Sequence, residues 1–200
     1  MSTVRDHSLE HNNRGHVCDF TLKYFREKYN CRSLLDIGAG RGINCAWAQQ
    51  YHEYEAVGIE ADPVLSNPVH DNIIQHDFVK DGVKQFDRTF DLGWSVATSE
   101  HIDASGADAY VQTFLACRWI VFTWCNPGYG GYHHVNEQYQ SYWLERFQKY
   151  GFEYEPALSE IIKRNNQLRM IKSLNKTGKS VRKGYLKDWA TVFENPQITE

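Results

Sequence analysis

The chain is organised around the segment Leu34-Leu35-Asp36-Ile37-Gly38-Ala39-Gly40-Arg41-Gly42. A short apolar run leads into a loop with three glycines, and a helical pattern begins at Ile43. A second apolar run, Ala56-Val57-Gly58-Ile59, ends on the carboxylate of Glu60. This order predicts a strand, turn, helix and strand that hold a nucleoside at the carboxyl ends of parallel strands. Glycine permits positive φ angles and close approach of a ligand, and the helix N-terminus favours an anionic group.

The spacing of the glycines indicates which nucleoside the loop binds. A dinucleotide fingerprint, GxGxxG, would require glycine at position 43, where the chain has Ile43. The chain instead reads GxGxG over positions 38–42, preceded by Asp36. This arrangement resembles motif I of the class I S-adenosylmethionine-dependent methyltransferases. Glu60 lies 22 residues after Gly38, close to the roughly 20 residues expected for an acid that binds ribose.

The resemblance implies a Rossmann-like α/β fold, a three-layer sandwich around a seven-stranded, mostly parallel sheet with an antiparallel last strand. It implies a single methyltransferase domain over residues 15–200, strongest over residues 30–156, after a flexible arm at residues 1–14. S-adenosyl-L-methionine is the implied cofactor. In the family, an acid at the place of Asp77 accepts from the adenine amino group, and an aromatic ring at Phe78 lies against the adenine. The implied cofactor-binding residues are Asp36, Gly38, Ala39, Gly40, Gly42, Glu60, Ala61, Asp77, Phe78 and Ser95.

Hydrophobic periodicity and turn signals predict the remaining elements. Helices are expected over residues 15–29, from residue 42, over 107–116 and over 141–147, and strands over 31–37, 55–60, 72–77, 90–96, 119–123, 152–154 and 189–193. The helical period after the glycine loop predicts a buried face formed by Ile43, Ala46, Trp47 and Tyr51.

Two segments carry candidate catalytic residues. The segment Thr98-Ser99-Glu100-His101-Ile102 resembles the "EHI" region of the family, where strand 4 ends beside the transferring methyl group. His101 beside Glu100 is a candidate base oriented by a carboxylate, although in the family this pair often caps a helix next to the cofactor. His134 lies in a segment that resembles a Gly-rich "GHVN" loop after strand 5 in small methyltransferases. Imidazole titrates near neutrality, so His134 is the second candidate base; the alternative is a histidine that holds the loop.

The loop before His134 is rich in glycine and aromatic residues. We interpret Trp124, Tyr129 and Tyr132 as the wall of a substrate pocket, or alternatively as packing within a lid. We expect no metal site, because clustered Asp and Asn ligands for magnesium are not recognisable at the ends of strands 4 and 5.

Length and composition indicate the number of domains and the cellular compartment. The 200 residues are typical of one domain, and the sequence has neither an apolar run of 18 residues nor a secretory signal pattern. The five cysteines are odd in number and never spaced CxxC. Free thiols in a reducing compartment are therefore expected rather than disulfides or a zinc site. We expect a cytoplasmic protein without a membrane partner.

Basic residues gather near the C-terminus. Nine Lys or Arg residues and no Asp or Glu occur from Lys163 to Lys187. Such a run is typical of a site for a phosphate-bearing substrate or nucleic acid. A solvated helix is the favoured alternative, because no base-stacking aromatic pattern is interleaved.

These features predict methyl transfer to a small polar acceptor, preferably an oxygen of a sugar or a phosphorylated metabolite. Base N-methylation is disfavoured, because the N/D-P-P-Y type of motif does not follow strand 4. Two alternatives stay open. One is a non-catalytic or partner-dependent S-adenosylmethionine-binding module, and the other is an RNA methyltransferase that uses the basic run over residues 163–187.

Overall fold

The computed structural model describes residues 17–62, 68–177 and 185–199, and all positions and contacts below concern this part of the chain. The arm expected at residues 1–14 lies outside it. Within it, one seven-stranded sheet runs in the order β3-β2-β1-β4-β5-β7-β6. The strands are β1 (Ser33–Ile37), β2 (Glu55–Glu60), β3 (Ile73–Gln75), β4 (Phe90–Ser95), β5 (Cys117–Phe122), β6 (Glu153–Tyr154) and β7 (Thr191–Glu194).

The pairing of the strands confirms the predicted fold class. Strands β1 to β5 pair in parallel, and β7 lies antiparallel between β5 and β6. Parallel strands require crossover connections, so their carboxyl ends meet at one edge of the sheet. The loops after β1, β2, β4 and β5 therefore gather there, which is where ligands bind in open α/β sheets.

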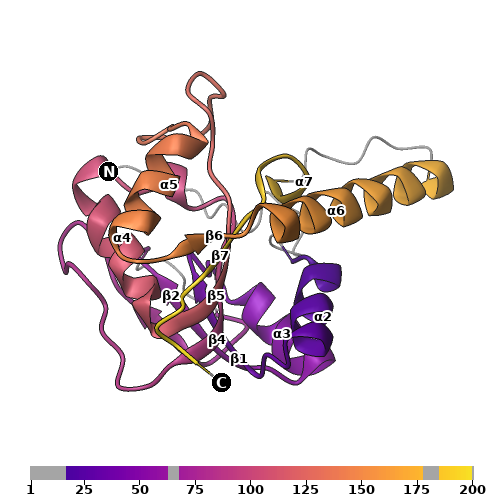
Figure 1. The fold of residues 1–200 in the computed structure, drawn as a ribbon, viewed down its shortest axis with the longest axis horizontal. Helices are drawn as coiled ribbons and strands as arrows, with labels where there is room; N and C mark the ends of the chain where they lie inside the picture. The colour runs from indigo at the N-terminus through magenta and orange to yellow at the C-terminus, as the bar shows by residue number, and fades with distance from the viewer. Residues whose placement is uncertain (1–16, 63–67, 178–184, 200) are drawn as a thin grey trace.

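Helices cover both faces of the sheet and make the molecule a three-layer sandwich (Figure 1). On one face lie α2 (Asp19–Lys28), α3 (Ile43–His52), α6 (Pro156–Thr177) and α7 (Tyr185–Trp189), and on the other lie α4 (Ala107–Thr113) and α5 (Gln140–Lys149). The short 3-10 helices are η1 (Ser99–His101), η2 (Ala104–Gly106) and η3 (Phe114–Ala116).

The sheet is buried on both faces because β1 carries apolar residues at successive positions. Side chains of adjacent residues point to opposite faces of a strand. Leu34 accordingly joins the core under α2 and α3, and Leu35 joins the core under α4 and α5. Both are fully buried, as expected for an interior strand that helices cover on both faces.

The buried face of α3 differs from the prediction. The helix begins after Gly42 as expected, but the buried residues are Asn44, Cys45 and Ala48. The predicted face, Ile43, Ala46, Trp47 and Tyr51, lines an outer groove, and of these residues Trp47 also packs against the core. The prediction placed the wrong side of α3 against the core. The buried carboxylate of Asp36 requires hydrogen-bond donors, and Asn44 and Cys45 point inward to supply them.

The C-terminal segment also differs in detail from the prediction. Residues 185–189 form α7, so the last strand begins at Thr191 rather than at Trp189. All five cysteines are free and buried, as expected. No helix in the described ranges is long and apolar enough to cross a membrane.

Candidate functional site

The glycine loop leaves β1 with positive φ angles at all three glycines, +81° at Gly38, +54° at Gly40 and +79° at Gly42. Two of them are required for packing. A Cβ at Gly38 would lie 2.2 Å from Oγ1 of Thr98, and a Cβ at Gly42 would lie 2.7 Å from Cβ of His70. At Gly40, a Cβ would meet no atom within 4 Å. Only Gly40 therefore offers its backbone to open space, where a ligand can approach closely.

Glu60, at the end of β2, faces this exposed backbone. Its Oε2 accepts a hydrogen bond from the Gly40 N–H at 2.9 Å. Its Oε1 accepts from the N–H groups of Ala61 at 2.8 Å and Asp62 at 3.0 Å. The loop is further tied to β2 by the N–H of Ala39, which donates to the carbonyl of Ile59 at 2.9 Å. A fixed negative charge thus lies beside the open part of the loop.

Asp36 lies beneath the loop rather than in the open space. It is buried, and its Oδ2 accepts from Nδ2 of Asn44 at 3.2 Å and from Sγ of Cys45 at 3.8 Å. Burial raises the pKa of Asp36 to about 7, opposed by the two hydrogen bonds and reinforced by the charge of Glu60. In this structure Asp36 anchors the start of α3, and its predicted cofactor contact stays a prediction.

The two residues after β3 are already engaged with the protein. Oδ1 of Asp77 accepts from the Val79 N–H at 3.0 Å, and its Oδ2 lies 2.7 Å from Nζ of Lys80. The hydrogen bond from Lys80 holds the pKa of Asp77 below its usual range. Phe78 is buried, with its ring edge-on to Tyr110 at a centroid distance of 5.5 Å. An adenine contact by Asp77 or Phe78 stays a prediction.

The end of β4 is bonded to the end of β1. Oγ of Ser95 donates to the carbonyl of Ile37 at 2.9 Å and accepts from the hydroxyl of Tyr110 at 2.6 Å. Oγ1 of Thr98 reaches the same carbonyl at 3.3 Å. Of these residues, Ser95 was predicted from the sequence as a site residue, whereas Thr98 and Tyr110 were not. The hydroxyl of Thr98 directly after β4 was the available signal, but its contact with Gly38 depends on how the two loops meet.

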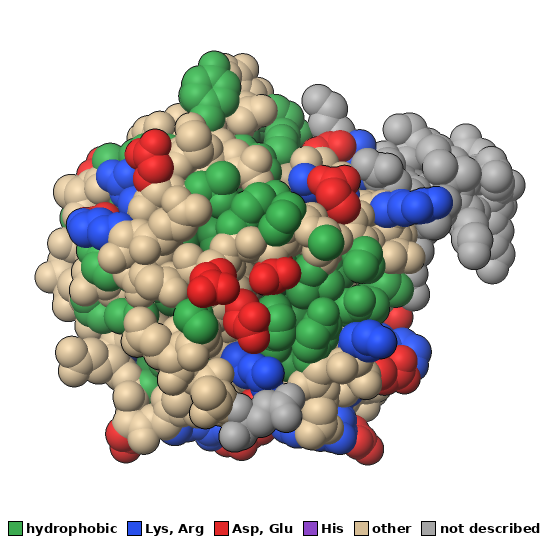
Figure 2. All heavy atoms as spheres, in the orientation of Figure 1, with side chains coloured by type: hydrophobic (Ala, Val, Ile, Leu, Met, Phe, Trp, Pro, Cys, Tyr) green, Lys and Arg blue, Asp and Glu red, His purple; other side chains and the backbone are tan. Residues whose placement is uncertain are grey.

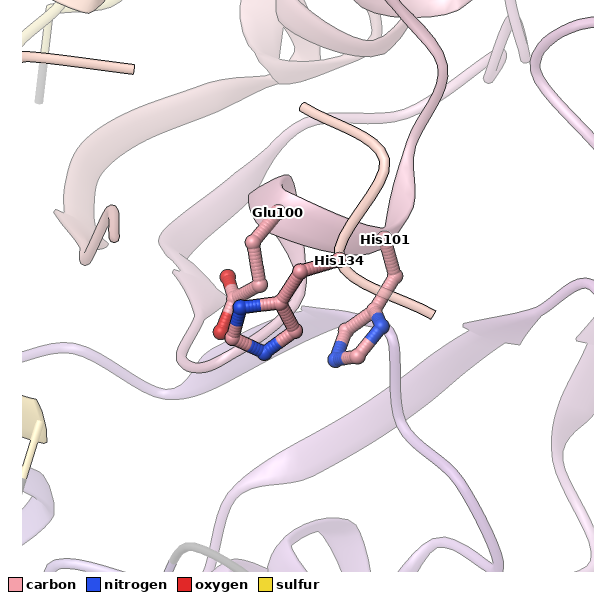
Figure 3. A group of neighbouring side chains, drawn as sticks. All are labelled: Glu100, His101 and His134. Carbon is pink, nitrogen blue, oxygen red and sulfur yellow. The ribbon is translucent and has the colours of Figure 1, made fainter. Parts of the chain in front are cut away.

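Three candidate catalytic residues come together at the carboxyl ends of β4 and β5 (Figure 3). Glu100 and His101 lie on η1, and His134 lies on the loop between β5 and α5. The backbone carbonyl of Glu100 accepts from the N–H groups of Val135 at 2.9 Å and Asn136 at 3.1 Å, which fastens that loop to η1. One ligand atom from each of the three side chains lies within 4.8 Å of the others.

The carboxylate of Glu100 is enclosed by protein. Its residue has no exposed surface, and neither oxygen makes a hydrogen bond of ordinary geometry. Burial raises the pKa of Glu100, whereas its own backbone, the charge of His134 and the nearby Tyr185 hydroxyl act in the opposite direction. Such a group requires a counter-charge or a proton at this position.

Glu137, which was not predicted from the sequence as a site residue, sets the orientation of His134. Nδ1 of His134 donates to Oε1 of Glu137 at 2.8 Å, since a carboxylate can only accept. The N–H groups of Gly128 and Gly130 donate to Glu137, each at 2.7 Å. The hydrogen bond from His134 lowers the pKa of Glu137, so the carboxylate stays ionised. An acid three residues after a histidine in a Gly-rich loop was the available signal.

The other nitrogen of His134 is approached by Gly131. A Cβ at Gly131 would lie 2.2 Å from Nε2 of His134, and Gly131 has no positive φ angle. Glycine is therefore required here for space and not for backbone conformation. Only a residue without a side chain leaves Nε2 of His134 in its observed place.

The aromatic residues of the loop lie in different surroundings. Trp124 is buried in the core and its Nε1 donates to Oδ1 of Asn126 at 3.1 Å. Tyr129 stacks parallel to His134 at a centroid distance of 6.5 Å. Tyr132 is 50% exposed. In Figure 2, hydrophobic side chains stand at the top of the molecule, where this loop projects in Figure 1. A role in substrate binding stays a prediction for all three.

The basic run has acidic partners at both ends of its described part. Nζ of Lys163 lies 2.8 Å from Oε1 of Glu160, and Nζ of Lys187 lies 2.8 Å from Oδ1 of Asp188. Residues 179, 182 and 183 of the run lie outside the described residues.

Comparisons with known proteins agree with this geometry. A family model described as "Methyltransferase domain" matches residues 9–166. No curated protein matches the sequence. Among solved structures, the YcgJ protein from Bacillus subtilis is similar with a TM-score of 0.51 and 18% identity, covering 69% of this chain and 70% of that chain.

Two further solved structures are similar. A TehB-like SAM-dependent methyltransferase from Corynebacterium glutamicum has a TM-score of 0.50 and 17% identity, covering 67% of this chain and 73% of that chain. A putative methyltransferase in complex with the Haloferax volcanii Trm112 activator has a TM-score of 0.57 and 12% identity, covering 96% of this chain and 94% of that chain. At these identities the structures show the fold. The family match confirms the predicted resemblance and S-adenosyl-L-methionine as the cofactor. The chain belongs to the family of S-adenosylmethionine-dependent methyltransferase domains.

Proposed function

We propose that this protein transfers a methyl group from S-adenosylmethionine to an oxygen of a small polar acceptor, such as a sugar or a phosphorylated metabolite. The observation that carries the proposal is the pairing of Gly40 with Glu60. An open backbone with no atom within 4 Å of a Cβ lies next to a carboxylate at the ends of β1 and β2.

The described residues fit the cofactor. The open side of Gly40 gives room for a ligand, and the carboxylate of Glu60 is an acceptor suited to ribose hydroxyl groups. Thr98 and Ser95 hold the ends of β4 and β1 together beside the loop. When bound, S-adenosylmethionine supplies an electrophilic methyl group attached to a sulfonium.

The acceptor would lie beside the cluster of Glu100, His101 and His134. Alignment of the acceptor oxygen with the methyl group is the main contribution of the protein, because proximity alone lowers the barrier by several kcal/mol. A hydroxyl acceptor also loses a proton. Nε2 of His134 is the nitrogen suited to accept it, because Nδ1 is bonded to Glu137. The charge of Glu137 then stabilises the imidazolium that forms.

Release of S-adenosylhomocysteine from the purified full chain, measured against a panel of sugars, sugar phosphates and other small hydroxyl compounds, tests the proposal. Turnover with one acceptor, lost in Gly40→Val, supports it. Calorimetric binding of S-adenosylmethionine without turnover on any acceptor, including in the presence of candidate protein partners, supports the binding-module alternative instead.

The RNA alternative is less well supported, because Lys163 and Lys187 are paired with acids. A gel shift with RNA over a range of salt concentrations tests it, since phosphate contacts make binding steeply salt-dependent. We include a cytoplasmic location in the proposal, because the five cysteines are free and buried.

A further inference from the structure

We propose that Glu100, His101 and His134 form a binding site for a divalent transition-metal ion. One carboxylate and two imidazoles offer ligand atoms that lie within 4.8 Å of one another. Bonds of about 2.0–2.2 Å to one ion require ligand atoms within about 4.4 Å of one another, so small side-chain shifts bring all three into range. Figure 3 shows the carboxylate of Glu100 and both imidazole rings side by side, extending in the same direction from η1 and from the facing loop.

Each imidazole ring donates a hydrogen bond from Nδ1 to an oxygen, as metal-binding histidines commonly do. Nδ1 of His101 donates to the backbone carbonyl of His133 at 3.1 Å, and Nδ1 of His134 donates to the carboxylate of Glu137 at 2.8 Å. An imidazole that donates from Nδ1 carries its lone pair on Nε2. Metal ligands commonly show this pattern, in which an oxygen behind each ring fixes the tautomer and the ring orientation.

The carboxylate of Glu100 gives a second, independent indication. The residue has no exposed surface, and neither carboxylate oxygen has a hydrogen bond of ordinary geometry. The nearby Tyr185 hydroxyl and the charge of His134 offset part of the cost of burying this carboxylate, and a cation would offset more of it. A bound cation facing the two histidines would replace its lost hydration and would account for a buried acid at this position.

A neighbouring cluster is a poorer site. Cys125, His134 and Glu137 also bring ligand atoms within 4.8 Å of one another. However, Oε1 of Glu137 is hydrogen-bonded to Nδ1 of His134, and the backbone of Gly128 and Gly130 donates to the same carboxylate. These atoms already satisfy each other, and they are better described as the support behind His134.

Two imidazoles and one carboxylate indicate the class of metal. Imidazole suits zinc, copper, iron and nickel, and carboxylates also bind manganese, whereas magnesium and calcium prefer all-oxygen ligand sets. Three protein ligands leave coordination positions for water or for an acceptor oxygen. The ion would therefore lie at the acceptor side of the site, and His134 would then act as a ligand rather than as the direct proton acceptor. This role of the ion rests on the proposed function, whereas binding of the ion does not.

The site was not expected from the sequence, which gave no metal-ligand spacing. Residues 100 and 101 are adjacent, but residue 134 lies on a different loop. The hydrogen bonds from Val135 and Asn136 to the carbonyl of Glu100, together with that from His101 to the carbonyl of His133, bring the third ligand to the other two.

Titration calorimetry with ZnCl2 and MnCl2, on the full chain in the absence of S-adenosylmethionine, tests the inference. We expect one saturable site for each metal, with MgCl2 binding far more weakly. His101→Asn should weaken the affinity at least tenfold, and the exposed position of His101 leaves the fold intact. Glu100→Gln, which keeps the size of the buried side chain, should do the same.

His133→Asn is the matched control. It removes an adjacent exposed imidazole, and asparagine tolerates the φ angle of +54° at this position. Its metal affinity should stay within about twofold of the parent. The inference is overturned if neither metal binds saturably at millimolar concentration, or if His101→Asn binds as tightly as His133→Asn. Metal binding without any methyl transfer would overturn the proposed function and leave this site standing.

Discussion

The N–H of Gly40 donates to the carboxylate of Glu60 at 2.9 Å, across the ends of the two neighbouring strands β1 and β2. The same glycine is the one in its loop at which a side chain would meet no protein atom. Gly38 and Gly42 are required because other side chains pack against them. Gly38 and Gly42 thus serve the packing of the loop, whereas Gly40 leaves its backbone open, and Glu60 lies beside Gly40.

Gly40→Val should abolish binding of S-adenosylmethionine, because a branched side chain would fill the open space and strain a backbone at φ +54°. Calorimetry with the cofactor is the measurement. Gly82→Val is the matched control, since Gly82 also has a positive φ angle and open space around it. Micromolar affinity retained in Gly40→Val would contradict the assigned site.

Glu60→Ala should weaken cofactor binding by about 1–3 kcal/mol, the usual range for hydrogen bonds to a charged group. The dissociation constant of S-adenosylhomocysteine is the readout. Because Glu60 also accepts from the backbone of its own loop, Glu60→Gln and a thermal melt serve as controls. An unchanged dissociation constant in both variants would remove Glu60 from the cofactor site.

His134→Ala should lower the rate of methyl transfer and leave the affinity for S-adenosylmethionine unchanged, because His134 lies on the loop between β5 and α5 and Gly40 lies on the loop after β1. Glu137→Gln should slow turnover as well, since it loses the charge that orients and stabilises the imidazole. Steady-state kinetics with an acceptor measures the rate of methyl transfer in both variants and distinguishes it from the affinity for S-adenosylmethionine. An unchanged rate in His134→Ala would exclude it from the mechanism.

Gly131→Ala should slow turnover through a steric effect on His134. The added methyl group would fall 2.2 Å from Nε2 of His134 and displace the ring, while the backbone of Gly131 needs no positive φ angle. A thermal melt of Gly131→Ala is the control, because an unchanged melting temperature separates displacement of the ring from loss of the fold. An unchanged rate in Gly131→Ala would show that access to Nε2 does not matter.

Asp36 should make the stability depend on pH. Burial raises its folded-state pKa to about 7, above the ordinary value near 3.8 expected in the unfolded chain. Between about pH 4 and 7 the folded chain keeps a proton that the unfolded chain has lost. The free energy of unfolding should therefore fall as the pH rises through this window, by at most about 1.4 kcal/mol per unit, and level off above it.

Denaturant unfolding of the parent chain and Asp36→Asn at several pH values tests this dependence. The amide in Asp36→Asn cannot ionise and still accepts a hydrogen bond from Asn44. The difference in stability between the two proteins should change in favour of Asp36→Asn as the pH rises. A difference that is independent of pH would show that Asp36 titrates normally in the folded chain.

Local chemistry made part of the fold and site predictable. The GxGxG loop, its positive φ angles and the acid after the next strand are properties of short segments, and β2 has the bounds that its apolar run predicts. The phase of α3 was not predictable in this way. The helical period of this segment is compatible with more than one buried face. The face of α3 that is buried depends on the carboxylate of Asp36, which lies on β1.

Local sequence patterns predict a parallel α/β sheet and a glycine loop facing an acid, because strand alternation, glycine φ angles and short loops depend on near neighbours in the chain. Long-range contacts determine which glycine is open, which carboxylate orients His134, and that Glu100, His101 and His134 meet. Those contacts join separate loops at one edge of the sheet. Their geometry depends on how β1, β4 and β5 are aligned, which local sequence patterns do not encode.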